Sequence, residues 1–320
     1  MRAALLLLVA CGSPERDKPT PTPTPTPTIE ARPSCKPGNT ICAGDDIKLC
    51  EDGTYHRTIT SCRGGCREGA CIETCGAHDV ELIYLVDDVG SLLSFDPRKL
   101  PADPFKRIGT LTCDPESRPY SMAIDRSGIA WVVYLTGILY RASIVDAHCL
   151  PSAAKVAGTP GGFGMGFVTD GPKATTEKLY ATSPEHAQLG TVDLAKLPPA
   201  WTSTGSIAIF DGRAPELTGT ADGRLYAYTP SDELRGFVRE IDRTGAGKGT
   251  RWTLPAERGL VGGFAFAFWG DVFYVFVTFN EANEVWAIRR KTGKLEKVLT
   301  SEHQIVGAGV STCAPLLERL

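Results

Sequence analysis

Residues 263–288 read GFAFAFWGDVFYVFVTFNEANEVWAI and carry the pattern that decides the fold. Small and aromatic residues alternate over 263–268, a Gly-Asp pair follows at 270–271, and aromatic and β-branched residues fill 272–277. A third apolar run covers 284–288. Alternation with a period of two, interrupted by Gly and Asp, is typical of short half-buried strands joined by tight turns. The stretch therefore predicts three consecutive antiparallel strands.

The same arrangement recurs along the chain. Copies begin near residues 119, 163, 215 and 261, a period of roughly 50 residues, and each has room for a looser fourth strand after the third. Four short strands per repeat of this length are the signature of a β-propeller. We therefore predict an all-β fold for the main domain, residues 76–317.

The two ends of this domain complete a further blade. Residues 82–86, 92–96 and 105–109 match second, third and fourth strands, but no first strand precedes them. Residues 305–310 supply the missing strand. Pairing the C-terminal strand with the N-terminal blade would close the ring and remove an open sheet edge. We expect a five-bladed propeller closed in this way, with six blades as the alternative, and residues 318–320 as a tail.

Eleven cysteines are present, seven of them between residues 35 and 75. Setting Cys11 aside leaves an even number, which predicts disulfides in an exported chain. Cys75 and Cys313 flank the predicted junction of the ring, and Cys113 and Cys149 bracket the second blade, so we predict these two pairs. The remaining six are expected to pair within a small module, in an order that the sequence leaves open: Cys35, Cys42, Cys50, Cys62, Cys66 and Cys71.

This Cys-rich module, residues 35–75, is rich in Gly and poor in large apolar residues. So short a segment cannot bury enough apolar surface to fold without covalent staples. Its cysteine density resembles that of small EGF-like or follistatin-like modules, which implies a disulfide scaffold but neither a calcium site nor a pairing. A zinc site built from the cysteines at 62–75 is the alternative.

The N-terminal residues indicate export. Arg2 precedes an apolar run that ends at Ala10, and residues 8–11, Leu-Val-Ala-Cys, resemble the lipobox of bacterial lipoproteins. The resemblance implies that 1–10 are a lipoprotein signal peptide and that Cys11 is lipidated. It also implies anchoring to the bacterial envelope, and to the outer membrane because no Asp follows the cysteine. An ordinary secretory signal cut elsewhere is the alternative.

Residues 11–34 are expected to form a stalk. Residues 19–28 are five consecutive Pro-Thr pairs, and proline prevents helix while favouring extended polyproline II. A spacer between the lipid and the folded part is the simplest function of such a segment.

A family resemblance agrees with the propeller prediction. The segment Asp125-Arg-Ser-Gly-Ile-Ala-Trp131 resembles the repeats of bacterial periplasmic sensor and streptogramin-lyase-type propellers. The resemblance implies the fold but no catalytic residue, because the His and Glu of the lyase active site have no matching motif here. The layout of lipobox, Pro-Thr stalk, Cys-rich module and propeller is similar to that of surface lipoproteins of myxobacteria.

Candidate functional residues lie on one predicted face. Propeller ligands usually sit over the central channel, beside the loops that enter the first strand and those that join the second and third. The second-to-third loops contribute the candidate ligand-face residues Asp87, Asp88, Glu185, His186, Asp232, Glu233 and Glu281. Their carboxylates would form an acidic rim suited to a cationic ligand, although exposed loops are commonly polar without any such function.

Several function classes receive no support from the sequence. A net charge of −3 and a pI near 6.0 without a basic stripe argue against nucleic acid as a partner. No catalytic motif occurs, and the five histidines form no metal-binding cluster, so we expect no cofactor, metal or catalytic residue. The sequence favours a non-enzymatic binding or scaffolding domain for an envelope protein, peptide or glycan. A propeller hydrolase or lyase that uses the mouth-loop carboxylates, and a purely structural protein, remain alternatives.

Overall fold

Four-stranded antiparallel sheets dominate the computed structural model, which describes residues 35–63, 65–159, 161–183, 187–207, 214–231 and 234–317. Within these residues there are five such sheets, together with one three-stranded and one two-stranded sheet. The only helical turn in the same ranges is a 3-10 turn, Pro97–Lys99. The prediction of an all-β chain is confirmed. Cys11, the signal segment and the Pro-Thr stalk lie outside the described residues.

Each of the five sheets has the same internal order, from a first to a fourth strand. The first strands are β25 (Ile305–Val310), β9 (Pro119–Ile124), β13 (Met165–Thr169), β17 (Glu216–Gly219) and β21 (Val261–Trp269). The second strands are β6 (Ile83–Asp87), β10 (Ile129–Tyr134), β14 (Glu177–Ser183), β18 (Leu225–Thr229) and β22 (Val272–Phe279). The third strands are β7 (Ser91–Phe95), β11 (Ile138–Ser143), β15 (Gln188–Asp193), β19 (Phe237–Ile241) and β23 (Ala282–Arg289). The fourth strands are β8 (Phe105–Thr110), β12 (Cys149–Lys155), β16 (Ala200–Ser206), β20 (Gly247–Thr253) and β24 (Leu295–Ser301).

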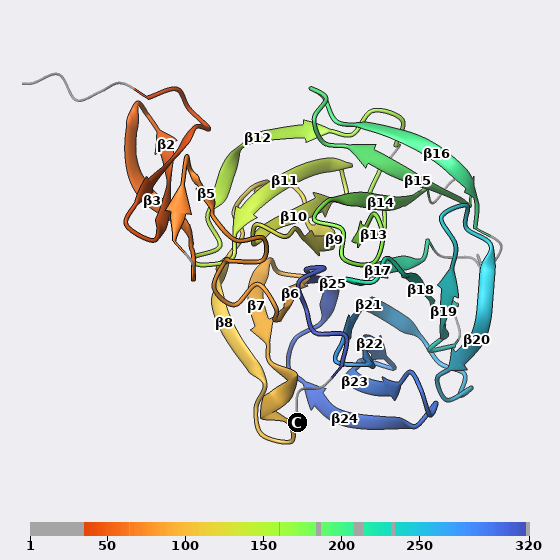
Figure 1. Cartoon of the computed structure of the whole chain (residues 1–320). Helices are drawn as coiled ribbons and strands as arrows, with labels where there is room; N and C mark the ends of the chain where they lie inside the picture. The colour runs from red at the N-terminus through yellow and green to blue at the C-terminus, as the bar shows by residue number, and fades with distance from the viewer. Residues whose placement is uncertain are drawn as a thin grey trace, which may run out of the picture. The chain divides into compact units, whose positions relative to one another are not determined.

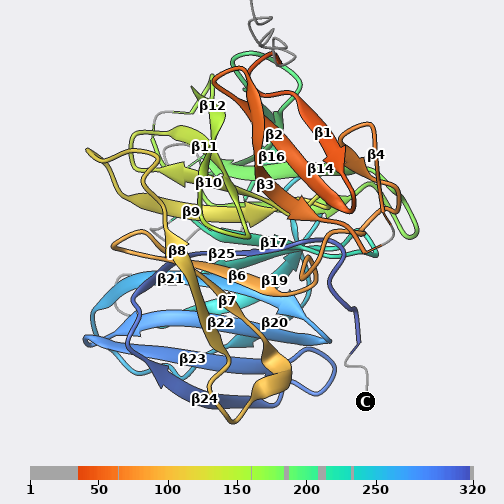
Figure 2. The same cartoon turned by 90° about the vertical axis from the view of Figure 1, so that its left-hand side faces the viewer.

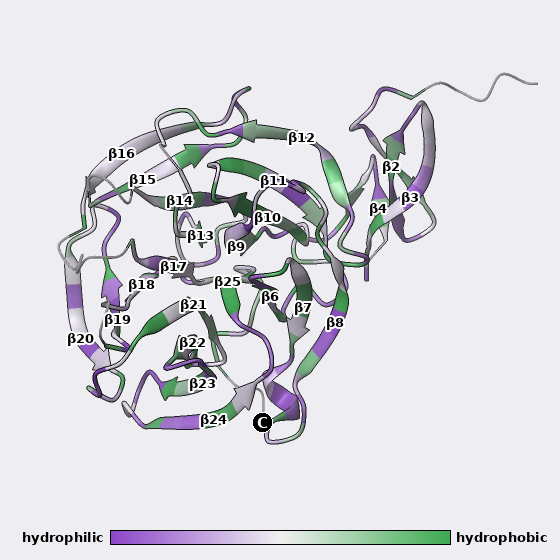
Figure 3. Ribbon diagram, turned by 180° about the vertical axis from the view of Figure 1, so that it is seen from behind, coloured by the Kyte–Doolittle hydropathy of each residue, from purple (hydrophilic) through white to green (hydrophobic). Residues whose placement is uncertain are grey.

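The sheets are arranged in a ring around the first strands. Figure 1 shows β9, β13, β17, β21 and β25 near the middle and the fourth strands at the periphery. In Figure 2, the strands β21 to β24 succeed one another outward from the middle. Burial follows this order, because every residue of β22 is buried whereas β20 is largely exposed. Figure 3 shows mainly purple and white on β20, whereas purple alternates with green on β24.

The first strands approach one another so closely that glycine is required at several positions. A Cβ on Gly164, just before β13, would lie 2.1 Å from the Pro215 carbonyl oxygen, far inside van der Waals contact. A Cβ on Gly219 of β17 would lie 2.1 Å from the Phe167 carbonyl oxygen. Glycine in a strand often marks such a close approach of two backbones. The small residues of the first strands therefore allow the sheets to meet at the centre.

The last strand of the chain pairs with the first sheet of the ring. β25 is antiparallel to β6, with partners that run from Ile305 opposite Asp87 to Val310 opposite Ile83. A disulfide joins Cys75, just before this sheet, to Cys313, just after β25. A second disulfide joins Cys113 to Cys149. These two bonds connect the cysteines that the sequence analysis paired.

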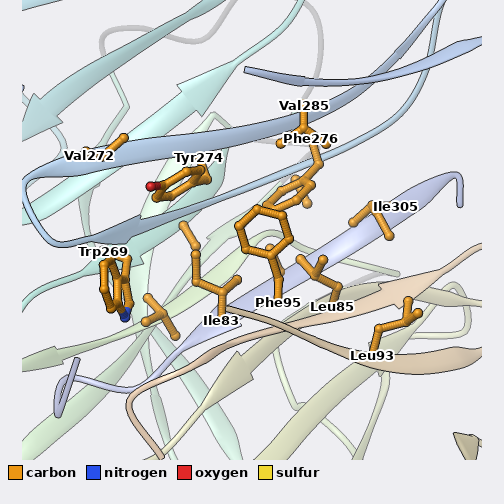
Figure 4. Packing of buried hydrophobic residues seen from close by; sticks show 14 of the residues in the cluster. Ile83, Leu85, Leu93, Phe95, Trp269, Val272, Tyr274, Phe276, Val285 and Ile305 are labelled. Atoms are coloured by element: carbon orange, nitrogen blue, oxygen red, sulfur yellow. The ribbon is translucent and has the colours of Figure 1, made fainter. Parts of the chain in front are cut away.

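Adjacent sheets are held together by apolar side chains. Figure 4 shows one such cluster, in which Phe95 of β7 lies against Tyr274 and Phe276 of β22. The ring centroids are 5.5 and 5.3 Å from that of Phe95. Edge-to-face and tilted aromatic pairs at these distances add to the stability gained from apolar burial. Ile83 and Leu85 of β6 belong to the same cluster.

The Cys-rich module contains the remaining strands: β1 (Thr40–Ala43), β2 (Asp46–Glu51), β3 (Thr54–Ser61), β4 (Cys66–Arg67) and β5 (Ala70–Cys71). Three disulfides join Cys35 to Cys50, Cys42 to Cys66 and Cys62 to Cys71. These bonds leave none of the six sulfurs as a thiolate for a metal. The module and the ring fall within one compact unit.

Ion pairs join the module to the ring. Glu51 of β2 accepts a hydrogen bond from His148 at 2.6 Å, and Arg57 of β3 donates one to Asp146 at 2.8 Å. Apolar residues of the module, Ile47 and Leu49, pack in one cluster with Ile129 of β10. Among the described residues, no helix is long and apolar enough to cross a bilayer.

Candidate functional site

One end of the ring gathers the loops that the sequence analysis associated with ligands. Because the second strand of each sheet is antiparallel to the first, its end lies beside the start of the first strand. The hydrogen bonds agree: the Asp88 N–H donates to the Gln304 carbonyl, and the Leu135 N–H donates to the Arg118 carbonyl, both at 3.0 Å. We call this end of the ring the mouth.

A pocket of about 540 Å³ opens at the mouth. Its walls come from the entrances of four first strands and from two second-to-third turns. The side chains used in the arguments below are Asp88, Arg118, Tyr120, Leu135, Glu216 and Phe264, with Gln304 and Val306 beside them. The volume is within the range of small-ligand sites.

Glu216 is the buried acidic residue of the pocket. It is the first residue of β17 and only 3% exposed. Its carboxyl accepts hydrogen bonds from the Ser121 hydroxyl, at 2.8 Å, and from the Met165 backbone N–H. Burial nevertheless raises the pKa of Glu216 well above its usual value, because these two bonds do not offset the loss of hydration. Burial therefore favours the neutral carboxylic acid over the carboxylate at this position.

Two oppositely charged side chains stand at the opening. Arg118 is exposed and Asp88 is half-buried, and both line the pocket. Neither has an ion-pair partner within the part of the chain that the structure describes. The mouth is therefore not lined by carboxylates alone, and a guanidinium is available to a bound molecule as well as a carboxylate.

Large aliphatic side chains face solvent in the loops at the mouth. Leu135 lines it and is 54% exposed. Val89 follows Asp88 in the β6–β7 turn and is 72% exposed, and Leu260, just before β21, is 78% exposed. Exposed aliphatic residues that gather on one face commonly mark an interaction surface, whereas single ones need no explanation. We call Val89, Leu135 and Leu260 the apolar rim.

Three of the seven candidate ligand-face residues can be placed. Asp88 lines the pocket. Asp87 is buried and accepts hydrogen bonds from the Ser91 N–H at 2.6 Å and the Val89 N–H at 3.2 Å, and its other oxygen lies 3.1 Å from Nδ1 of His303. It orders the turn and does not line the pocket.

Glu281 is exposed in the β22–β23 turn, with a φ of 68°. It does not line the pocket either. The other four candidates lie outside the described residues: Glu185, His186, Asp232 and Glu233.

Sequence reasoning missed the groups at the strand entrances. Glu216, Arg118 and Tyr120 all lie at or just before a first strand, and the analysis named such entrances as part of the ligand face. A carboxylate placed directly before the apolar residue Leu217 was the available signal. Its burial depends on β9 and β13, which contribute Ser121 and Met165, and the sequence does not show that contact.

A second carboxyl with a raised pKa, half-buried, lies at the opposite end of the ring. Glu177, the first residue of β14, accepts hydrogen bonds from the Arg126 N–H at 2.8 Å and the Thr312 hydroxyl at 2.7 Å. Burial raises the pKa of Glu177 to about 7. Thr312 precedes Cys313, so this carboxyl holds the segment that carries the Cys75–Cys313 disulfide.

Metal binding receives no support from the described side chains. No group of three or more His, Cys, Asp and Glu residues lies close enough together there to hold an ion.

Comparisons with known proteins give distant similarities. No family model matches the chain, and no curated protein matches it. Among solved structures, one from the nidogen/laminin complex aligns with 71% of this chain and 97% of its own, at 10% identity and a TM-score of 0.46. Glutaminyl cyclase of Myxococcus xanthus aligns with 61% of this chain and 71% of its own, at 15% identity and a TM-score of 0.37. Apo AztD of Citrobacter koseri aligns with 69% and 57%, at 14% identity and a TM-score of 0.32. TM-scores below 0.5 do not support an assignment of fold or function.

Proposed function

We propose that this chain is a lipid-anchored envelope protein whose ring is a five-bladed β-propeller, and that its mouth binds a segment of another envelope protein without catalysis. The apolar rim of the mouth is the observation that carries the proposal. Three solvent-facing aliphatic residues in the loops of the mouth, one of which lines the pocket, are difficult to explain in a protein that binds nothing there.

The five-bladed assignment is supported by the strand pairing. Five sheets of identical internal order surround the first strands, and β25 completes the sheet of β6, β7 and β8. In this interpretation the pairing of β25 with β6 closes the propeller, and the Cys75–Cys313 disulfide reinforces the closure. Six blades would require a further sheet.

Export is indicated by the five disulfides, because such bonds persist in oxidising compartments. Lipidation of Cys11 is part of the proposal and is supported by the lipobox resemblance of residues 8–11. Attachment to the outer membrane follows from the same resemblance, and the Pro-Thr stalk would hold the propeller away from the bilayer.

A protein segment suits the mouth better than the other ligands considered. A cationic ligand was expected from an acidic rim, but Arg118 lines the pocket as well as Asp88. A glycan would need mainly polar contacts, whereas Leu135, Phe264 and Val306 line the pocket. Apolar side chains around a few fixed polar groups match the composition of protein-binding pockets.

The enzyme alternative has little support from the geometry. It required mouth-loop carboxylates that converge, yet Asp87 and Glu281 do not line the pocket. The hydrogen-bond partners of the buried Glu216 are Ser121 and Met165, neither of them a second carboxyl group. Among the described residues, no second carboxyl group is hydrogen-bonded to Glu216, and this arrangement favours binding over hydrolysis.

The proposal can be tested with a library of random twelve-residue peptides displayed on phage. The full chain would be the bait, and a Leu135→Glu/Leu260→Glu variant would be used for counter-selection. A matched control, Val145→Glu, changes a residue that is also 54% exposed but lies between β11 and β12. We expect peptides that bind the chain and the control but lose at least tenfold in affinity for the double variant. Peptides that bind all three proteins equally would contradict a site at the mouth.

A further inference from the structure

When Glu216 is in its neutral form, the hydrogen atoms at the floor of the mouth pocket do not all have acceptors. One contact, 2.8 Å long, joins the Ser121 hydroxyl oxygen to one oxygen of Glu216. Glu216 is 3% exposed, and burial favours its neutral form. In that form Glu216 and the serine bring two hydroxyl protons to this contact, and a single O···O contact can hold only one of them. The Met165 N–H, the other partner of Glu216, is also a donor and cannot take the second proton.

The remaining proton belongs to a residue that lines the pocket. When Ser121 donates to Glu216, the carboxyl O–H is left without an acceptor among the described residues. Ser121 is fully buried, whereas Glu216 lines the pocket. A buried donor without a partner is energetically unfavourable. The floor of the pocket is therefore built to receive an oxygen acceptor from outside.

We propose that Glu216 determines the specificity of the mouth site by donating a hydrogen bond from its carboxyl group to a carbonyl oxygen of the bound segment. This inference rests on the proposed binding function and names the chemistry that the site selects. The apolar rim and the pocket walls contact the side chains of the segment, and Glu216 fixes one amide carbonyl. A cation is disfavoured at the same position, because the neutral acid offers it no opposite charge.

The assignment predicts that binding depends on pH. The groups that face Glu216 from the strands packed on it, the Ser121 hydroxyl of β9 and the Met165 amide of β13, are uncharged. The charged side chains that line the same pocket are Arg118 and Asp88, of opposite sign. Ionisation of Glu216 removes the proton that is donated, so affinity for a carbonyl should fall as the pH rises through the pKa of this group in the folded protein. A neutral hydrogen bond of ordinary strength corresponds to roughly a three- to tenfold change in affinity.

Two small probes of matched carbon skeleton test the inference. 3-Methylbutanamide carries a branched apolar tail and a carbonyl, whereas 3-methylbutylammonium carries the same tail and a cation. Titrations of the full chain would be followed by NMR, through the backbone amide signals of Gly262 and Gly263, which line the pocket. The proteins are the wild type, Glu216→Gln, whose amide keeps an N–H donor that cannot ionise, and Glu216→Leu.

We expect the amide to bind the wild type at pH 5 three- to tenfold more tightly than it binds Glu216→Leu, and more tightly than the ammonium probe binds. In the wild type its affinity should fall as the pH rises through the pKa of Glu216, but in Glu216→Gln it should stay constant. Equal affinity of the amide for the wild type and Glu216→Leu, or a preference for the ammonium, would overturn the role of Glu216 while leaving a mouth site. If neither probe shifts the Gly262 and Gly263 signals of any of the three proteins, the proposed binding site itself fails, and this inference with it.

Discussion

Removal of the disulfide between Cys75 and Cys313 should destabilise the chain more than removal of any other bridge. The two cysteines are separated by 238 residues, and the Cys113–Cys149 bridge, with a separation of 36, lies inside that loop. Allowing for the inner bridge leaves a flexible loop of about 200 residues in the unfolded chain, for which the loop-entropy relation gives about 5 kcal/mol. We expect the double variant Cys75→Ser/Cys313→Ser to lose roughly 2–5 kcal/mol of unfolding free energy.

The native ring should survive this change. β25 remains paired with β6 from Ile305 opposite Asp87 to Val310 opposite Ile83, and the aromatic cluster around Phe95 is unaffected. The loss should therefore arise in the unfolded state, where the released chain gains conformational freedom.

Urea denaturation in non-reducing buffer, followed by tryptophan fluorescence, measures the effect. The matched control is Cys113→Ser/Cys149→Ser, for which the same relation gives about 4 kcal/mol. The first variant should unfold at the lower urea concentration. An unchanged midpoint, or a smaller loss than in the control, would refute the entropic reasoning. It would indicate that the pairing of β25 with β6 alone stabilises this junction.

Three further predictions follow from individual residues. Gly164→Ala should cost about 1–3 kcal/mol, because its Cβ would meet the Pro215 carbonyl oxygen at 2.1 Å, whereas Gly171→Ala, with nothing within 4 Å, should unfold at the wild-type urea concentration. The pKa of Glu177 is raised by burial to about 7 in the folded protein, so its contribution to stability is present at low pH and lost as the pH rises through that value. Glu177→Gln should remove this decline, up to about 3 kcal/mol between pH 5 and pH 8, and an identical pH dependence of the urea midpoint in both proteins would contradict the assignment. Cys11→Ala should move the protein from the membrane fraction to the soluble fraction on centrifugation, and retention with the membranes would argue against lipidation of this cysteine.

The strands were predictable because their signal is local. Alternation over 263–268 and the aromatic run over 272–277 correspond to β21 and β22, and the position of 305–310 as a first strand corresponds to β25. In each case a few neighbouring residues carry the period of two, and a Gly or Asp pair marks the turn.

The pocket was less predictable because its residues come from different sheets. In the sequence, Glu216 resembles any other acidic residue at the start of a strand. In the structure, the Ser121 hydroxyl of β9 lies 2.8 Å from the Glu216 carboxyl, and Glu216 is buried. Conversely, Asp87 has the position expected of a ligand group, but hydrogen bonds to its own turn and to His303 occupy its carboxylate. Whether a carboxylate stabilises a turn or lines a binding site depends on hydrogen-bond donors that are distant in the sequence. The alternation of apolar and polar residues along a strand contains no information about those donors.

The Cys75–Cys313 bond also has a mechanical consequence for a tethered protein. If the N-terminal side is held at a surface while a partner pulls on the ring, tension enters the ring through Cys75. From there it reaches Cys313 along a covalent bond. The five residue pairs between β25 and β6 then need not bear the load by hydrogen bonds alone. The disulfide thus reinforces the ring where its two ends meet, at the pairing of β25 with β6.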